Sequence, residues 1–593
     1  MRLCRRRIWI EQYWIDSSET NIEMRRVVII GGGITGLAAA HRILERNHEL
    51  GKQVDLTLLE AGSRIGGIVQ TRERDGFLLE SGPDSFISEK PEALELTKRL
   101  GLESHLIETN EYHRRSFIVS QGRLLPVPEG FHLLAPSRFW PFFRSDIFSW
   151  AGKARMALDL LLPRRKPAPH AGCPRGDPAL NSNTDRDNDA IDDAIDDALT
   201  DESLAQFVRR RLGREALERM AQPMVGGIYT ADPERLSLRA SMPRFLEMER
   251  EHRSLIRALR KQGRSPTPGS AAGQPRWGGS VWEGSAGGGG GPIVMKGSQV
   301  DQQTSGARYS LFLSFDRGMQ LLTDKLEERI SDLKSQISDL RSQISNSKPE
   351  ISNFKSQISE GERLVQSPIR VNTAVESLTL EHAEGEETPK WKVRTNRDET
   401  LVADAVCLAL PAYVSARLLS SVDAQLATEL DGISYASSAT INLAYRQEDI
   451  PHPLDGFGFV VPFIEGRSLI ACTFSSVKFP GRAPQGHALL RAFIGGALQP
   501  EMFDLSPDEL ISRACADLRD LLGIEQAPLF AEVSKWERSM PQYHVGHLER
   551  VKRIRERLAS LPGLALAGNA YTGLGIPDCI RSGEAAAEVV DAV

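Results

Sequence analysis

The residues best suited to chemistry lie in a glycine-rich turn near the start of the chain. Gly31, Gly33 and Gly36 have G-x-G-x-x-G spacing and follow the short apolar run 27–30, which predicts a buried parallel strand. In such a turn the first glycine permits a tight bend, the second lets the backbone approach a pyrophosphate, and the third lets a helix pack closely on the strand. Residues 37–44 are mostly good helix formers, so the turn predicts a phosphate site at a helix N-terminus.

A carboxylate stands where a dinucleotide site needs one. The run Val54–Leu59 predicts a second strand, and Glu60 follows it directly. A carboxylate at this place accepts hydrogen bonds from ribose hydroxyls. The β–α–β unit therefore predicts dinucleotide binding, and at this point NAD and FAD fit equally well.

A second glycine-rich segment, residues 61–68, follows at once. Arg64 can bind a phosphate, and the pair Gly66–Gly67 lets the backbone pass close to a flat or charged group. An ordinary turn with a surface arginine is the alternative that this segment leaves open when it is taken alone.

Composition excludes several classes of protein. The chain has 593 residues, a net charge of −6 and 26% charged residues, and no basic stripe with interleaved aromatic residues indicates a nucleic-acid partner. Its six cysteines show neither CxxC nor metal-ligand spacing, which predicts a reducing compartment, no disulfide framework and no metal site. No apolar run reaches the roughly 20 residues that a membrane span requires.

Together, the GGGITG turn, Glu60 and the R-x-G-G step resemble the FAD-dependent amine oxidase superfamily. The sequence GPDSF at 82–86 narrows this to the oxygen-dependent protoporphyrinogen oxidase and coproporphyrinogen III oxidase family, in its bacterial soluble type. The resemblance covers 25–260 and 309–593. It has one small departure, Arg317-Gly318 in place of the usual Gly-Gly. It includes the segments 91–102, 222–237, 314–322 and 561–590, and Trp536 followed by Pro541-Gln542-Tyr543.

This resemblance implies an α/β fold: a Rossmann-like FAD domain of the two-dinucleotide-binding type, an antiparallel-sheet substrate domain and a helical subdomain. It also implies that FAD is held from both ends of the chain, with the backbone of Val375 at the adenine end and Trp536 near the flavin. The FAD-binding residues expected are Gly31, Gly32, Gly33, Ile34, Thr35, Gly36, Glu60, Ala61, Arg64, Gly67, Ile68, Gly82, Pro83, Asp84, Ser85, Val375, Trp536, Gly568, Gly575 and Ile576.

The implied reaction is the oxidation of a porphyrinogen, coproporphyrinogen III or protoporphyrinogen IX, to the porphyrin in heme biosynthesis. Hydride passes to the flavin in each of three two-electron cycles, and three O2 are reduced to three H2O2. No catalytic side chain is assigned, and Lys90, Asp84 and Arg115 are candidates for contact with the substrate. The GPDSF segment favours the coproporphyrinogen type. A flavin amine oxidase, a carotenoid-type desaturase and a non-catalytic FAD-fold binding protein are the alternatives.

The expected domain organisation alternates core segments with insertions. Residues 1–23 are a disordered extension, and the true start is Met1 or Met24. The acidic stretch 163–201, the Gly/Ser-rich linker 261–307 and the heptad repeat 330–360 are insertions. The core segments are 24–100, 308–329, 361–430 and 536–593 for FAD, 101–260 for the helical subdomain, and 431–535 for the antiparallel sheet.

The resemblance implies a porphyrinogen and O2 as reactants and a cytoplasmic location. Residues 128–150 are rich in aromatic residues and prolines, a composition that lines a hydrophobic pocket, touches a membrane face or simply packs in a core. Peripheral membrane association, hand-off of the product to a ferrochelatase, and the choice between monomer and homodimer stay open.

Overall fold

The computed structural model describes residues 24–132, 134–163, 201–262, 312–346, 367–382 and 388–592. The expectations for the N-terminal extension, for nearly all of the acidic and Gly/Ser-rich stretches, and for the heptad repeat beyond residue 346 lie outside these residues.

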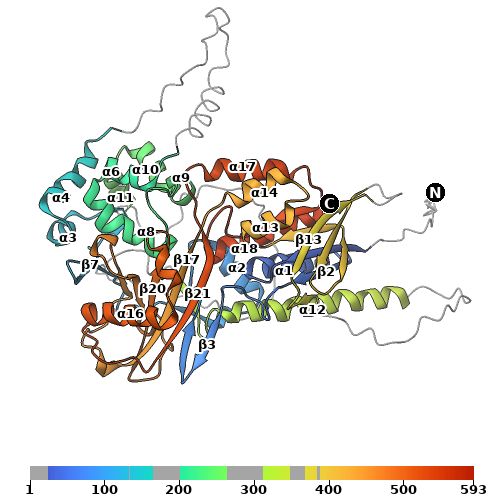
Figure 1. Cartoon of the computed structure of the whole chain (residues 1–593), viewed down its shortest axis with the longest axis horizontal. Helices are drawn as coiled ribbons and strands as arrows, with labels where there is room; N and C mark the ends of the chain where they lie inside the picture. Colours follow the sequence, from blue (N-terminus) through green and yellow to red (C-terminus); the bar gives the residue numbers. More distant parts are fainter. Residues whose placement is uncertain are drawn as a thin grey trace, which may run out of the picture.

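A five-stranded parallel sheet forms the centre of the first domain (Figure 1). Its order is β12-β2-β1-β16-β22, so β1 lies in the middle with β2 and β16 as its neighbours. The chain returns to this sheet from three distant segments, as a dinucleotide-binding fold assembled from separate parts requires. The strands are β1 (Arg25–Ile30), β2 (Val54–Leu59), β12 (Ile369–Arg370), β16 (Ala405–Leu408) and β22 (Leu564–Leu566).

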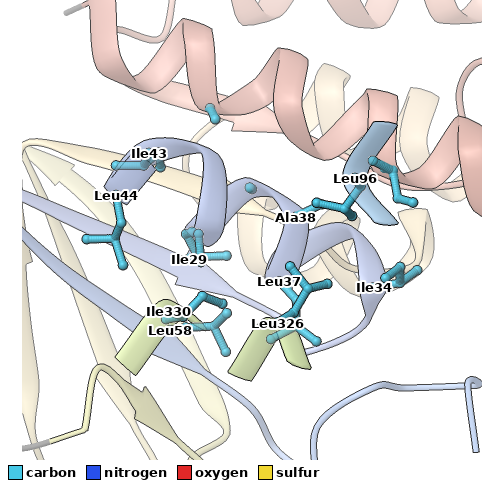
Figure 2. Packing of buried hydrophobic residues seen from close by; sticks show 14 of the residues in the cluster. Ile29, Ile34, Leu37, Ala38, Ile43, Leu44, Leu58, Leu96, Leu326 and Ile330 are labelled. Atoms are coloured by element: carbon cyan, nitrogen blue, oxygen red, sulfur yellow. The ribbon is translucent and has the colours of Figure 1, made fainter. Parts of the chain in front are cut away.

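Both faces of β1 are buried. Successive side chains of a strand point to opposite faces of the sheet, and the two sets of β1 lie in two different apolar clusters. Val27 and Ile29 belong to the apolar cluster formed with α1, α12 and α18. Figure 2 shows Ile29 and Leu58 of this sheet packed with Leu37 and Leu326 of the helices. The three helices are α1 (Ile34–Glu49), α12 (Gln320–Asn346) and α18 (Ile576–Ala592).

The opposite face of the sheet is covered by a small antiparallel sheet and by helices. Val28 and Ile30 pack there in one cluster with the fully buried Trp391. An apolar run with both faces covered is what a parallel strand requires. The covering elements are β13 (Val375–Glu381), β14 (Lys390–Thr395), β15 (Thr400–Ala403), α13 (Ala412–Leu419), α14 (Ala424–Asp431) and α17 (His547–Leu558).

The second domain is built on a seven-stranded sheet of order β21-β17-β20-β19-β18-β7-β8. All of its neighbouring strands are antiparallel except β18 and β7. Helix α16 (Pro507–Leu522) covers one face with Leu510, Ala514 and Leu518. The strands are β7 (Phe117–Ser120), β8 (Arg123–Pro126), β17 (Tyr435–Arg446), β18 (Gly458–Val460), β19 (Leu469–Phe474), β20 (His487–Gly495) and β21 (Phe530–Pro541).

Helices between residues 139 and 262 form the third part, which Figure 1 shows at the end of the molecule remote from α1 and β2. The helical spacing of the apolar residues that begin at Leu204 predicts one helix over 204–220, but the structure interrupts it at Gly213, which has a φ of +98°. The helices are α3 (Phe139–Arg144), α4 (Trp150–Ala157), α6 (Leu204–Arg211), α7 (Arg214–Ala216), α8 (Gln222–Tyr229), α9 (Leu238–Ser241), α10 (Pro243–His252) and α11 (Leu255–Gln262).

Short elements join these parts. The hairpin of β3 (Thr71–Arg74) and β4 (Phe77–Glu80) leads into β5 (Phe86–Ile87), which pairs with β11 (Phe312–Phe315) beside β6 (Leu106–Glu108). Helix α2 (Pro91–Arg99) follows β5 and packs against α18. The described fold is the α/β FAD domain with an antiparallel-sheet domain and a helical subdomain that the resemblance implies.

The boundaries of these parts differ from the expected ones. Helix α12 does not break at residue 330, where the heptad insertion was expected to begin. Ile330, Leu333 and Ile337 are buried in the core of the FAD domain. They lie on the same face of α12 as the buried Leu326. Strand β21 crosses the expected boundary at 536, and β7 and β8 join the seven-stranded sheet although they precede the helical subdomain.

Candidate active site

The β1–α1 turn needs its glycines for two different reasons. Gly31 has a φ of +110°, and a β-carbon there would lie 2.4 Å from the Ala409 carbonyl oxygen. A β-carbon on Gly36 would lie 1.9 Å from the Gly31 carbonyl oxygen. These two positions let α1 start against the strands β1 and β16.

Gly33 faces open space instead. A β-carbon on Gly33 would meet nothing within 4 Å. Gly33 is also the N-cap of α1, and no side chain caps this helix. The first N–H groups of a helix have no partner within the helix, so the space beside Gly33 suits an anion.

Glu60 is fixed between the two glycine-rich segments. Its Oε2 accepts a hydrogen bond of 2.7 Å from the Gly32 amide, and its Oε1 accepts one of 2.7 Å from the Gly62 amide. Its carbonyl oxygen accepts from the Thr373 amide at 2.8 Å, which brings the start of β13 at Val375 to this acid. The residues expected at the ribose and at the adenine therefore lie together.

The R-x-G-G segment packs directly on the first turn. The Gly66 amide donates to the Gly32 carbonyl at 2.7 Å, and a β-carbon on Gly67 would lie 3.2 Å from the α-carbon of Gly33. The Arg64 guanidinium donates to the carbonyl oxygens of Ile65, Gly67 and Val69. Arg64 thus shapes this segment, and a contact with phosphate remains a prediction. A hollow beside it is lined by Ser63, Arg64, Ile65, Gln320, Asp324, Glu327 and Val371.

The segment 81–85 lies between the FAD domain and the seven-stranded sheet. A β-carbon on Gly82 would stand 1.7 Å from the Ile68 carbonyl oxygen, so only glycine lets the two segments approach so closely. From the other side, the Ser81 carbonyl accepts hydrogen bonds from Thr440 Oγ1 at 2.8 Å and from Trp536 Nε1 at 3.0 Å. Trp536 therefore lies at this junction, and its place near the flavin remains a prediction.

Asp84 is held as an anion at the same junction. Its carboxylate accepts hydrogen bonds from Lys478 Nζ at 2.9 and 3.0 Å and from Ser85 Oγ at 2.7 Å. Burial alone would raise the pKa of Asp84, but Lys478 and Arg491 outweigh burial and hold the pKa well below its usual range. Its role toward a substrate remains a prediction.

Lys90 is engaged with the C-terminal helix. Its ammonium group lies 2.6 and 2.7 Å from the two carboxylate oxygens of Asp578, whose side chain is 3% exposed. Asp578 also accepts hydrogen bonds from Arg581 at 2.6 Å and from the Gly575 amide at 3.2 Å. The pair joins the start of α2 to the start of α18, and 43% of the Lys90 side chain remains exposed.

Arg115 lies elsewhere. It pairs with the carboxylate and carbonyl of Asp455 and stacks over the ring of Phe117. It precedes β7, which lies near one edge of the seven-stranded sheet. Trp536 belongs to β21, at the opposite edge. The observed contacts of Arg115 do not place it at the junction formed by residues 81–85. Its contact with a substrate remains a prediction.

The C-terminal segment closes on the first turn. Gly568 lies against the carbonyl of Leu410, whose side chain also approaches Gly31. A β-carbon on Gly583 of α18 would stand 2.2 Å from the Thr35 carbonyl oxygen, so α18 packs tightly on the start of α1. Ile576 is buried at the beginning of α18. Both ends of the chain thus build one site.

Sequence reasoning missed several residues of this site. Lys478 and Arg491 hold the segment 81–85, Arg491 by donating to the carbonyl oxygens of Ser81 and Gly82. The one local signal for Arg491 is a charged residue inside the apolar run of β20. Tyr543 belongs to the segment Pro541-Gln542-Tyr543 of the resemblance, which implies no role for it.

The turn after β1, together with Glu60, offers the hydrogen-bond donors and acceptors that FAD requires. Open space and free helix N–H groups at Gly33 suit a phosphate, and each Glu60 oxygen has a further lone pair for a ribose hydroxyl. Helix α18, from the far end of the chain, packs on this turn, and an antiparallel sheet lies beside it. A simple β–α–β dinucleotide site has neither feature. The class of protein that this fold and site define is that of the FAD-dependent oxidoreductases.

Comparison with known proteins identifies the family. Residues 34–591 match the flavin containing amine oxidoreductases, and the chain belongs to that family. It is 31% identical to a coproporphyrinogen III oxidase of Bacillus subtilis, with 95% of this chain and 97% of that protein covered. It is 33% identical to one of Propionibacterium freudenreichii, with 95% and 91% covered.

Two further comparisons define the range of the likeness. A chloroplastic protoporphyrinogen oxidase of Nicotiana tabacum is 28% identical, with 95% of this chain and 85% of that protein covered. The crystal structure of a putative protoporphyrinogen oxidase from Exiguobacterium is 27% identical, with a TM-score of 0.69 and with 96% of this chain and 99% of that chain covered. Within the described ranges, no helix is both long enough and apolar enough to cross a membrane.

Proposed function

We propose that this FAD-dependent oxidoreductase oxidises a porphyrinogen to the corresponding porphyrin, with coproporphyrinogen III as the preferred substrate. Six electrons and six protons leave the macrocycle, and three O2 take them up as three H2O2. The proposal places the reaction in heme biosynthesis.

The observation that carries the proposal is the place of the segment 81–85. It touches the R-x-G-G segment through Gly82 and the antiparallel sheet through Ser81. A substrate that reacts with the flavin must reach the boundary between these two parts. The GPDSF sequence that resembles the porphyrinogen oxidases therefore lies at the junction where a substrate would bind.

Similarity supports the choice of substrate. The coproporphyrinogen III oxidases that match over 95% of this chain are 27–33% identical to it, and the B. subtilis and P. freudenreichii proteins exceed 30%. The protoporphyrinogen oxidases compared are 25–29% identical. The two porphyrinogens differ at two positions, where coproporphyrinogen carries propionates, so the preference must come from groups that bind carboxylates.

The residues of the chain bind and orient the reactants. FAD, when bound, supplies the two-electron redox chemistry. Gly33 and the start of α1 leave room for its phosphates, and Glu60 offers acceptors for its ribose. Lys90 is the candidate for a substrate propionate, because its side chain is 43% exposed while the ion pair with Asp578 orients its ammonium group.

The related alternatives predict other substrates. Putrescine oxidase has a similar fold, with a TM-score of 0.55 at 15% identity, a likeness that shows the fold alone. The side-by-side test offers the purified protein coproporphyrinogen III, protoporphyrinogen IX and an amine in the presence of O2. Porphyrin fluorescence and H2O2 should appear with the porphyrinogens, faster with coproporphyrinogen III, and in a ratio of three H2O2 per porphyrin.

Two results would contradict the proposal. A protein that takes up FAD but oxidises neither porphyrinogen, or oxidises the amine instead, would contradict the substrate. A colourless protein that FAD does not reconstitute would contradict the cofactor and favour a non-catalytic binding protein. The variant Lys90→Met, compared with Lys98→Met on the exposed side of α2, separates a substrate contact from a general change of charge.

A further inference from the structure

The connection between β21 and α17, residues 541–547, touches two separate parts of the molecule. Its backbone is bonded to the helical subdomain: the Tyr543 carbonyl accepts from the Ser237 amide at 2.8 Å, and the Val545 amide donates to the Arg235 carbonyl at 2.9 Å. Its side chains reach the C-terminal loop 569–575. The connection therefore joins the helical subdomain to the loop that leads into α18.

The Tyr543 hydroxyl closes this loop. It donates to the Asn569 carbonyl at 2.5 Å and accepts from the Gly573 amide at 2.8 Å. Tyr543 is 3% exposed, so water does not replace these bonds readily. One phenol thus links two backbone groups four residues apart and fixes the width of the loop.

His547 reinforces the same contact. Its ring stacks on the ring of Tyr543, with centroids 4.0 Å apart and an angle of 12° between the planes. Its Nε2 lies 3.2 Å from the Tyr571 carbonyl, a third backbone group of the loop. Because a carbonyl only accepts, Nε2 carries the proton in this contact. His547 is 4% exposed.

The loop in turn sets the start of α18. Gly573 has a φ of +128°, and a β-carbon there would stand 2.3 Å from Asp578 Cγ. The Gly575 amide donates to the carboxylate of Asp578. The loop and the first turn of α18 are therefore packed as one unit, which contains the predicted FAD residues Gly575 and Ile576.

We infer that Tyr543, supported by His547, is a positioning residue of the FAD site. It holds the loop 569–575 and the start of α18 in place, and through the backbone of residues 543–545 it couples this unit to the helical subdomain. The inference rests on the FAD site, and its link to turnover rests also on the proposed function.

The test compares Tyr543→Phe with Tyr445→Phe. Both variants remove one hydroxyl from a buried tyrosine, but Tyr445 lies in the core of the seven-stranded sheet, where its hydroxyl contacts Cys515 Sγ at 3.8 Å. FAD is titrated into the apoprotein, and the visible flavin spectrum and the flavin midpoint potential are recorded. Y543F should weaken FAD binding about 5- to 30-fold, equivalent to about 1–2 kcal/mol, and should shift the spectrum and the potential. Y445F should leave all three unchanged.

The contradicting results are equally direct. Y543F with wild-type affinity, spectrum and potential would overturn the inference, and so would equal changes in Y445F. If Y543F does not fold, His547→Phe keeps a stacked ring but loses the Nε2–H. It should shift the same readouts in the same direction, and unchanged readouts in this folded variant would overturn the inference. These readouts need no porphyrinogen, so a failure of the proposed function is recorded separately, as bound flavin without turnover.

Discussion

At the scale of single residues, glycines with the same spacing do different work. Gly36 allows α1 to approach β1, because a β-carbon there would overlap the Gly31 carbonyl oxygen. Gly33 leaves a space that no protein atom fills within 4 Å. The first is a requirement of the fold and the second a requirement of the ligand.

This difference predicts opposite outcomes for two similar substitutions. Gly33→Ala should leave the unfolding free energy of the apoprotein within about 0.5 kcal/mol of wild type, because the φ of −72° at Gly33 is ordinary for alanine. It should weaken FAD binding about tenfold or more, equivalent to about 1.4 kcal/mol, because the methyl group occupies the phosphate space. Gly36→Ala should instead destabilise the apoprotein by about 2–3 kcal/mol.

Urea unfolding and FAD titration measure the two effects. Equal FAD affinity in Gly33→Ala and wild type would show that the phosphates do not lie beside Gly33.

At the scale of elements, local patterns predicted those elements whose contacts are local. The strand Val54–Leu59 has the bounds that the sequence predicts. The sequence 119–127 predicts a hairpin around Gln121-Gly122. Strands β7 and β8 form it, with positive φ at both turn residues, as a two-residue hairpin loop requires. Helix 204–220 was expected to be continuous, but Gly213 interrupts it.

The partners of the segment 81–85 could not be predicted in this way. Lys478 and Arg491 lie about 400 positions further along the chain from Asp84 and Gly82, and no spacing rule connects them. The first residues of the heptad repeat, 330–337, belong to the core and not to an insertion, and the sequence does not reveal this for a related reason. Its period is that of a coiled coil as well as of a long helix packed on a sheet, and only the tertiary contacts of Ile330 and Ile337 distinguish the two.

The first part of this repeat should therefore behave as core. Ile330→Ala should lower the unfolding free energy by about 2–4 kcal/mol, since Ile330 is fully buried between α12 and the parallel sheet. Asp332→Ala, at an exposed position of the same helix, should change it by no more than about 0.5 kcal/mol. Chemical denaturation of both variants provides the measurement. If Ile330→Ala lowers the free energy of unfolding by less than about 1 kcal/mol, the first part of the repeat is not core.

At the scale of the whole molecule, the two domains are joined by buried polar contacts around the segment 81–85. Asp84 and Lys478 form a charged pair at this junction, with side chains 17% and 13% exposed. Removal of one partner leaves the other charge buried without compensation, which is costly. The junction therefore couples the stability of the molecule to the charge of Asp84.

Asp84→Asn should lower the unfolding free energy by about 2–4 kcal/mol at neutral pH. Because the folded-state pKa of Asp84 is depressed, the wild-type advantage is complete above the unfolded-state pKa of about 3.9 and is lost as pH falls through the folded-state pKa. The deficit should thus be constant from pH 8 to pH 5 in denaturation curves. Asp398→Asn, whose side chain is 97% exposed, is the control, and a deficit that disappears near neutral pH would contradict the assigned charge.

The most direct test of the central claim removes oxygen from the reaction. Under anaerobic conditions, coproporphyrinogen III mixed with the FAD-loaded protein should bleach the visible flavin band in a single turnover. Subsequent admission of O2 should restore the band and release porphyrin fluorescence as the cycles proceed. Protoporphyrinogen IX should bleach the flavin more slowly. A flavin band that persists with both porphyrinogens, in a protein that binds FAD, would contradict the account.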